Sequence, residues 1–138
     1  SNPPTEADWS LASWNNKFGS DYVQLGGVSG SGECSCTTKK AFYLPSTVNI
    51  KVWTDCTLRT NRLGSGIFTT WYTTDFTVSV NNNKLISKNS GKDNDKNEWR
   101  TQLTGTGTMA NGNTINCKSS YAAAGPYVKV HSITVDYL

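Results

Sequence analysis

The amino-acid sequence predicts an all-β protein, a sandwich of two antiparallel sheets with about eight strands. Short segments of alternating apolar and polar residues recur along the chain, and turn residues separate them, as in β-sandwiches. The composition agrees, because five Trp, six Tyr and four Phe accompany many Thr, Asn, Ser and Gly, the usage of sheet surfaces and turns. The length suits one domain, residues 1–138. Residues 1–4 resemble a cut or tagged start, so we expect either a free protein or a module of a longer secreted one.

The C-terminal segment, residues 125–138, carries the clearest strand signal. Val128 and Val130 alternate with polar residues, and the phase then shifts by one, so that Ile133 and Val135 form the next apolar pair. A shift of this kind predicts a strand interrupted by a bulge, here at His131 and its neighbour Ser132. We therefore expect the chain to end on a strand that lies between or beside strands formed earlier.

The first part of the chain predicts a lid and two strands. Residues 9–18 space their large apolar side chains as a single helical turn would, or as a loop folded onto a sheet, and both place them over the core. Residues 22–25 predict a short strand closed by two glycines. Residues 34–44 predict a second strand, which Pro45 ends.

The next segment, residues 48–55, alternates most regularly. Val48, Ile50 and Val52 fall on one face, which we expect to be buried. Asn49, Lys51, Trp53 and Asp55 fall on the other. We therefore expect the Trp53 indole on the solvent-exposed face of a sheet, beside polar side chains.

Five further strands are expected after this segment. Residues 67–72 and 76–80 predict strands, and the turn at 81–84 predicts a hairpin with Leu85 and Ile86. Residues 87–98 are polar and predict a surface loop. Residues 99–107 and 109–117 predict two strands joined at a turn.

Charge and hydropathy exclude two classes of partner. The net charge is only +3 and the basic residues are scattered, so we expect no nucleic-acid binding. No apolar run approaches the roughly 20 residues that span a bilayer, so we expect no transmembrane segment. The sequence does not define the oligomeric state.

The four cysteines predict disulfides and a secreted or extracellular location. Two bridges can be drawn among them, and a Cys34–Cys36 bond is the least expected because so short a ring strains the bond geometry. The remaining pairings stay open. A zinc site is disfavoured, because Cys56 and Cys117 each lack a close second ligand and the chain has one His.

The order of these segments resembles that of jelly-roll domains in the galactose-binding-like superfamily, which includes many carbohydrate-binding modules. In the first half the likeness rests on residues 22–27, a Gly-Ser turn, a Cys-Thr strand, Leu44-Pro45 and an alternating strand. In the second half it rests on residues 76–80 with their Asn turn, Trp99, residues 115–117 and the closing residues 125–135. The resemblance implies a jelly-roll β-sandwich that binds a glycan, a protein or a lipid.

The resemblance also implies a structural calcium ion near the terminal strands. Glu6, Asp8 and Asp136 are the residues that could supply oxygen ligands to it. The chain departs from the family pattern at the bulge, where His131 and Ser132 stand in place of acidic or amide residues. We expect His131 to be a structural or site-edge residue and not a catalytic base.

Aromatic side chains are the main candidates for ligand binding. A sugar ring stacks its C–H face on an aromatic ring, while amide and charged groups bind its hydroxyls. Trp53 has such neighbours in Asn49, Lys51 and Asp55. Trp71 and Tyr72 are adjacent on opposite faces, so one of the two should be exposed. The competing interpretation is that each Trp belongs to the core, and we prefer it for Trp9, Trp14 and Trp99.

We therefore expect a secreted, non-catalytic module that binds a polysaccharide or glycan. No enzyme is expected, since no carboxylate pair is fixed in the facing geometry of a glycosidase and no G-x-S-x-G motif occurs. A protein-interaction or virulence domain that binds a host or cell-surface protein is the main alternative, marked by an apolar patch on one sheet. A membrane-surface protein would instead show an exposed aromatic loop with basic flanks.

Overall fold

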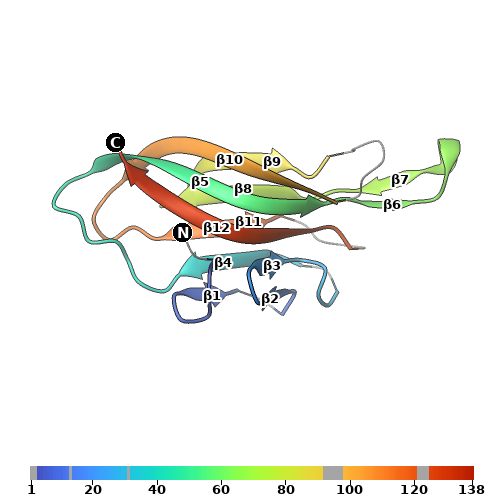
Figure 1. Cartoon of the computed structure of the whole chain (residues 1–138), viewed down its shortest axis with the longest axis horizontal. Helices are drawn as coiled ribbons and strands as arrows, with labels where there is room; N and C mark the ends of the chain where they lie inside the picture. Colours follow the sequence, from blue (N-terminus) through green and yellow to red (C-terminus); the bar gives the residue numbers. More distant parts are fainter. Residues whose placement is uncertain (1–2, 13, 31, 92–97, 121–124) are drawn as a thin grey trace.

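The computed structural model is a β-sandwich, and it describes residues 3–12, 14–30, 32–91, 98–120 and 125–138 (Figure 1). Two five-stranded sheets form its layers, and all their strand pairs are antiparallel. Sheet I contains, in spatial order, β1 (Trp9–Leu11), β4 (Cys34–Thr38), β11 (Ile115–Ser119), β8 (Asp75–Val80) and β9 (Asn83–Asn89). Sheet II contains β10 (Glu98–Met109), β5 (Val48–Arg59), β12 (Tyr127–Tyr137), β3 (Val23–Leu25) and β2 (Asn16–Phe18).

A small third sheet extends one end of the sandwich. It consists of β6 (Asn61–Leu63) and β7 (Thr70–Tyr72), which pair as a hairpin, with the 3₁₀ turn η1 (Gly66–Phe68) at its tip. Figure 1 shows this hairpin projecting beyond the ends of the other strands. Among the described residues no helix has the length and apolar character needed to cross a bilayer.

The predicted class, a sandwich of two antiparallel sheets, is confirmed, but the predicted number of strands is too low. The described residues form twelve strands instead of about eight. Three of the strands that raise the count, β1, β2 and β6, have three residues each, while β7 falls inside the strand predicted at residues 67–72. Three residues hold only one repeat of a period of two, which is too little for the apolar pattern to mark β1, β2 and β6 as separate strands.

The core lies between the two sheets and follows the predicted alternation. In β5, Ile50 and Val52 are fully buried and the intervening residues face outward. Sheet I contributes Phe76, Val78 and Val80 from β8 to the same core. Each sheet thus has one apolar inner face and one polar outer face.

The final strand lies in the middle of sheet II, as the sequence predicts. β12 is paired on one side with β5 and on the other with β3. Its register with β5 shifts between Val130 and Ser132, which is where the apolar phase shifts in the sequence. The bulge leaves Val130 buried on one side of it and Ser132 aligned with Asp55 on the other.

The predicted hairpin and the predicted pair of strands at residues 99–107 and 109–117 have different outcomes. β8 and β9 form the first, and its two turn residues, Asn81 and Asn82, have positive φ angles, as a tight hairpin turn requires. The predicted pair is also found as two strands, but the break lies later: β10 ends at Met109, β11 begins at Ile115, and the two belong to different sheets. The sequence-based division at residue 108 was wrong because the Thr-Gly repeat has no apolar residue to mark its inner face.

The predictions for the N-terminal region need two corrections. The described residues between 9 and 18 form neither a helical turn nor a simple lid, since β1 joins sheet I and β2 joins sheet II. Trp9 and Trp99 pack in or against the core as expected, but Trp14 is 73% exposed. Asn15 is buried in its place, and its side chain accepts hydrogen bonds from the N–H groups of Val28 and Ser29 at 2.9 Å each.

The predicted strand at residues 34–44 is shorter in the structure. β4 ends at Thr38, and residues 39–47 form the connection to β5. Phe42 and Leu44 still pack against the core, but from this connection. Phe42 is fixed there by exchanging backbone hydrogen bonds of 2.8 Å with Asn113 and Gly112.

Candidate functional site

The side chains of β5 that face away from the core form the centre of the candidate site. Lys51, Trp53 and Asp55 point away from the core, because the residues between them are buried. The Trp53 indole is half-buried, and its Nε1 donates a 2.7 Å hydrogen bond to Oδ2 of Asp136 on β12. Lys51 Nζ lies 4.0 Å from the centroid of the Trp53 ring system, a cation–π contact. These contacts fix the orientation of the indole.

An open depression of about 420 Å³ lies beside this indole, within the size range of small-ligand sites. It is lined by Trp53, Asp55, Arg100, Thr101, Gln102, Ser132 and Thr134. Lys51 does not line it, and Lys51 and Asp55 lie on opposite sides of Trp53 along β5. The depression is therefore on the side of the indole away from the lysine.

Three neighbouring strands supply the lining, because sheet II places them in register. Gln102 on β10 and Ser132 on β12 are both aligned with Asp55. Thr134 on β12 is aligned with Trp53. Residues directly opposite one another in antiparallel strands share a face, so an indole, a carboxylate, an amide and two hydroxyls converge there.

An ion pair forms one wall of the depression. Arg100 donates from Nε to Asp55 Oδ1 at 3.0 Å and from Nη2 to Asp55 Oδ2 at 2.8 Å, a bidentate arrangement. These hydrogen bonds lower the pKa of Asp55 below its ordinary value. Since 61% of the Arg100 side chain and 33% of the Asp55 side chain remain exposed, both groups keep surface available to a ligand.

A second aromatic group continues the outer face of sheet II beyond the bulge. His131 is half-buried, its Nε2 is 2.7 Å from Thr57 Oγ1, and its ring meets Tyr22 edge-on at 6.3 Å. Lys129 Nζ lies 4.7 Å from the Tyr22 ring and 5.4 Å from the Tyr127 ring. His131 thus stands between the depression and this cluster, with a hydrogen-bonded structural role.

The predicted ligand residues do not all come together. Trp53 and Asp55 line the depression, and Lys51 contacts the Trp53 ring without lining it. Asn49 lies further along β5, where its backbone carbonyl accepts a 2.9 Å hydrogen bond from Leu138. Trp71 and Tyr72 are on the β6–β7 hairpin, where both are half-buried and the Arg62 guanidinium lies 5.7 Å from the Trp71 ring. Eight residues of extended chain separate Trp53 from the start of β6, roughly 26 Å.

Sequence reasoning missed the residues that β10 and β12 contribute. Arg100, Gln102, Ser132 and Thr134 carry no motif of their own. The alternation of polar residues along 100–108 marks an outer face only once β10 is known to pair with β5. The pairing joins segments about fifty positions apart, and no local pattern encodes it.

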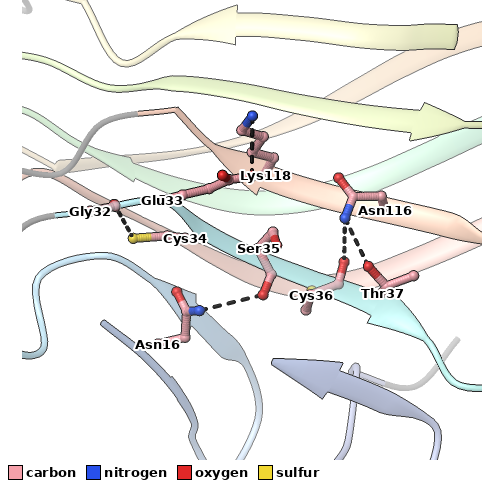
Figure 2. A network of polar contacts seen from close by, with 9 residues as sticks. All are labelled: Asn16, Gly32, Glu33, Cys34, Ser35, Cys36, Thr37, Asn116 and Lys118. Atoms are coloured by element: carbon pink, nitrogen blue, oxygen red, sulfur yellow. Dashed lines mark hydrogen bonds and ion pairs between the residues drawn. The ribbon is translucent and has the colours of Figure 1, made fainter. Parts of the chain in front are cut away.

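The outer face of sheet I carries a different polar surface (Figure 2). There Asn116 Nδ2 donates to Thr37 Oγ1 at 2.8 Å, and Lys118 Nζ lies 3.2 Å from Glu33 Oε1. A depression of about 430 Å³ lies on this face, but none of the described residues that line it is aromatic. We therefore place the candidate site on sheet II.

All four cysteines are free thiols, so the expected disulfides are not formed in this structure. Cys36 and Cys117 are directly opposite each other on β4 and β11, inside the core. Burial is the main cause that raises the pKa of Cys117, and a hydrogen bond with Cys36 adds to it. Cys34 is separate, and its thiol donates to the Gly32 carbonyl at 3.2 Å (Figure 2).

The structure does not bring together the three acidic residues considered for calcium. Glu6 borders a depression that also includes Trp9 and Lys39, while Asp136 is bonded to Trp53 on sheet II. Across the described part of the chain no group of three or more His, Cys, Asp and Glu side chains is placed to hold a metal ion. Calcium binding through Glu6, Asp8 and Asp136 thus has no geometric support.

Comparison with known proteins adds a likeness of fold. No family model and no curated protein matches the chain. Among solved structures, the secreted serine protease VesC from Vibrio cholerae matches with a TM-score of 0.52 and 11% identity over 93% of this chain. The chain spans 24% of the length of that protease. A CBM35 from Paenibacillus barcinonensis matches with a TM-score of 0.46 and 18% identity, over 94% of this chain and 88% of its own. At 11% identity, the likeness to the protease concerns the fold alone.

Proposed function

We propose that the protein binds a glycan without catalysis, through the depression beside Trp53 on the outer face of sheet II. The observation that carries this proposal is the lining itself, in which one indole is combined with Asp55, Arg100, Gln102 and Thr134. The indole provides an apolar face for the C–H surface of a sugar ring. The carboxylate, guanidinium, amide and hydroxyl provide donors and acceptors for the sugar hydroxyls.

The electrostatics of the depression support binding over hydrolysis. Asp55 is the carboxylate of the lining, and the Arg100 hydrogen bonds lower its pKa. A general acid at neutral pH needs a raised pKa, and a glycosidase needs a second carboxylate across the site. Asp55 is better suited to accept hydrogen bonds from hydroxyl groups while it remains ionised.

The first prediction concerns Trp53. We expect Trp53→Ala to weaken glycan binding at least about tenfold, because the variant loses the stacking surface. The free energy of unfolding should fall by no more than about 2 kcal/mol, since the ring is only half-buried and makes one hydrogen bond. A pull-down panel of insoluble polysaccharides, followed by affinity electrophoresis on those that bind, measures the first effect, and urea unfolding measures the second.

Trp71→Ala is the matched control. It removes a second half-buried indole that also has a cationic neighbour, but on the β6–β7 hairpin. Binding should survive this change. A loss of binding in Trp71→Ala with retention in Trp53→Ala would place the site elsewhere, and a panel in which no polysaccharide is bound would reject the proposal. Adding a chelator to the same panel tests whether calcium contributes.

An extracellular location is part of the same proposal, because polysaccharides are the ligands in question. Secretion was expected because the cysteines were expected to form disulfides, but all four are free thiols. The proposed location therefore rests on the proposed ligand. A protein-binding function on a sheet face is less well supported. The most exposed large apolar side chains, Trp14, Tyr43, Ile67 and Phe68, lie in connections and at the hairpin tip.

A further inference from the structure

We propose that the tip of the β6–β7 hairpin inserts into the surface of an anionic lipid bilayer. This activity is separate from glycan binding and uses a different part of the molecule. The hairpin extends beyond the end of the sandwich in Figure 1, so its tip can reach a flat surface before other elements do. Its end carries Ile67 and Phe68, which are 93% and 81% exposed.

The exposure of these two side chains is built into the backbone of the tip. The N–H of Phe68 donates to the Ser65 carbonyl at 3.1 Å, and the N–H and hydroxyl of Thr69 both donate to the Gly66 carbonyl, at 3.3 and 2.8 Å. Gly64 has a φ of +89°, and a Cβ there would lie 2.3 Å from the Phe68 carbonyl oxygen. Only glycine allows the backbone at position 64 to come this close to Phe68, and the turn closed in this way holds Ile67 and Phe68 outward.

The same hydrogen bonds suit the tip to an apolar environment. Backbone N–H and C=O groups that enter a membrane without partners carry a large free-energy penalty. At this tip the N–H groups of Phe68 and Thr69 and the carbonyls of Ser65 and Gly66 are already paired with one another. These pairings lower the free-energy cost of insertion, because fewer backbone groups give up hydrogen bonds to water as the tip enters the interfacial region.

Charge and aromatic content favour an anionic bilayer. Residues 60–74 contain no Asp or Glu, and they contain Arg62. Arg62 is stacked on Trp71, and Tyr72 follows on the same strand. Trp and Tyr are enriched at membrane interfaces, and each basic residue near an anionic surface favours binding. From the tip inward, the hairpin thus presents apolar side chains for the bilayer interior, then aromatic side chains for the interface and an arginine for the anionic headgroups.

The tip is too small for a protein partner of ordinary size. A stable protein interface buries about 800 Å² on each side and draws on about 20 residues or more. Here the strongly exposed apolar surface is that of two residues in a three-residue turn, with Leu63 adding a partly exposed side chain. A bilayer needs no shape complementarity, so two inserted side chains contribute to binding by themselves.

Co-sedimentation of the full chain with phosphatidylcholine vesicles, with and without phosphatidylglycerol, tests the proposal. We expect binding to the mixed vesicles that weakens as salt is raised. The double variant Ile67→Ser, Phe68→Ser should lower the partition coefficient at least about tenfold, because serine supplies no apolar surface. Arg62→Gln should lower it about fivefold on the anionic vesicles and leave pure phosphatidylcholine unaffected.

Tyr43→Ser is the matched control. Tyr43 is 85% exposed and lies in the connection between β4 and β5, which Figure 1 places at the opposite end of the sandwich. This variant and Trp53→Ala should both bind vesicles like the unmodified protein. No sedimentation with mixed vesicles, or an equal loss in Tyr43→Ser, would overturn the proposal. A dimer in sedimentation velocity that the double serine variant dissociates would also overturn it, and would assign the tip to a second copy of this chain.

Discussion

Replacing Gly105 by valine is expected to lower the free energy of unfolding by about 3 kcal/mol or more. Gly105 is on the inner face of β10, where the edges of the two sheets meet at β9. A Cβ at this position would lie 1.9 Å from the Leu85 carbonyl oxygen and 2.9 Å from Ile86 Cγ1. The first of these contacts is with backbone, which cannot change rotamer, so β9 would have to move and open the sandwich.

Two comparisons make this result specific. Thr106→Val places the same side chain on the next residue of β10, but on the exposed face, and should change stability by less than about 0.5 kcal/mol. Gly107→Ala should cost less than Gly105→Val, because its Cβ would meet the Leu85 side chain, at 3.0 Å from Cγ. Urea unfolding measures the free energy of unfolding of the three variants, and their m-values should match that of the unmodified protein. Stability of Gly105→Val within about 0.5 kcal/mol of the unmodified protein would show that the sheet edges are not in contact there.

The sequence predicts those parts of the fold that depend on neighbouring residues. The alternation in β5 and the shift of phase in β12 are both properties of a single strand, and both are found in the structure. Apolar side chains at every second position can be buried in only one way, so the inner and outer faces follow directly. That is why the outward position of Trp53 could be predicted without knowing what pairs with its strand.

The composition of the candidate site required knowledge of which strands pair. Arg100 reaches Asp55 because β10 and β5 are adjacent, although the two residues are 45 positions apart. Asp136 reaches Trp53 across β12, over 83 positions. Asn49 was included in the predicted site from its phase alone, and the structure places it away from the depression. Phase identifies the face of a strand, whereas the position of a site along that face depends on neighbouring strands.

The error at Trp14 has a related cause. Large aromatic residues are usually buried, and this expectation assigned Trp14 to the core. β1 ends at Leu11 in sheet I and β2 begins at Asn16 in sheet II, and just before β2 the buried side chain is Asn15, which accepts hydrogen bonds from the backbone of residues 28 and 29. A backbone that needs a hydrogen-bond partner inside the protein can therefore exclude an apolar side chain from the interior.

The protein is expected to lose stability steeply above pH 9 under reducing conditions. Burial raises the pKa of the Cys56 thiol from its ordinary value of 9.0 to about 12. Above pH 9 the unfolded chain releases this proton while the folded chain retains it, so the unfolded state binds fewer protons and the free energy of unfolding falls as pH rises. Cys56 alone contributes a decrease of about 1.4 kcal/mol per pH unit, or on the order of 4 kcal/mol by pH 12.

The variant Cys56→Ala identifies the group responsible. Its stability at pH 8 should be lower because the smaller side chain leaves a gap in the core, but its dependence on pH above 9 should be less steep by about 1.4 kcal/mol per unit. Burial also raises the pKa of the Cys117 thiol, so part of the pH dependence of stability should remain in the variant. Urea unfolding at pH 8, 9, 10 and 11 measures the slopes, and alkylation in denaturant without reductant counts the free thiols by intact mass. Equal slopes in the two proteins would show that Cys56 is not protonated inside the fold, and fewer than four alkylated cysteines would show that a disulfide replaces the free thiols.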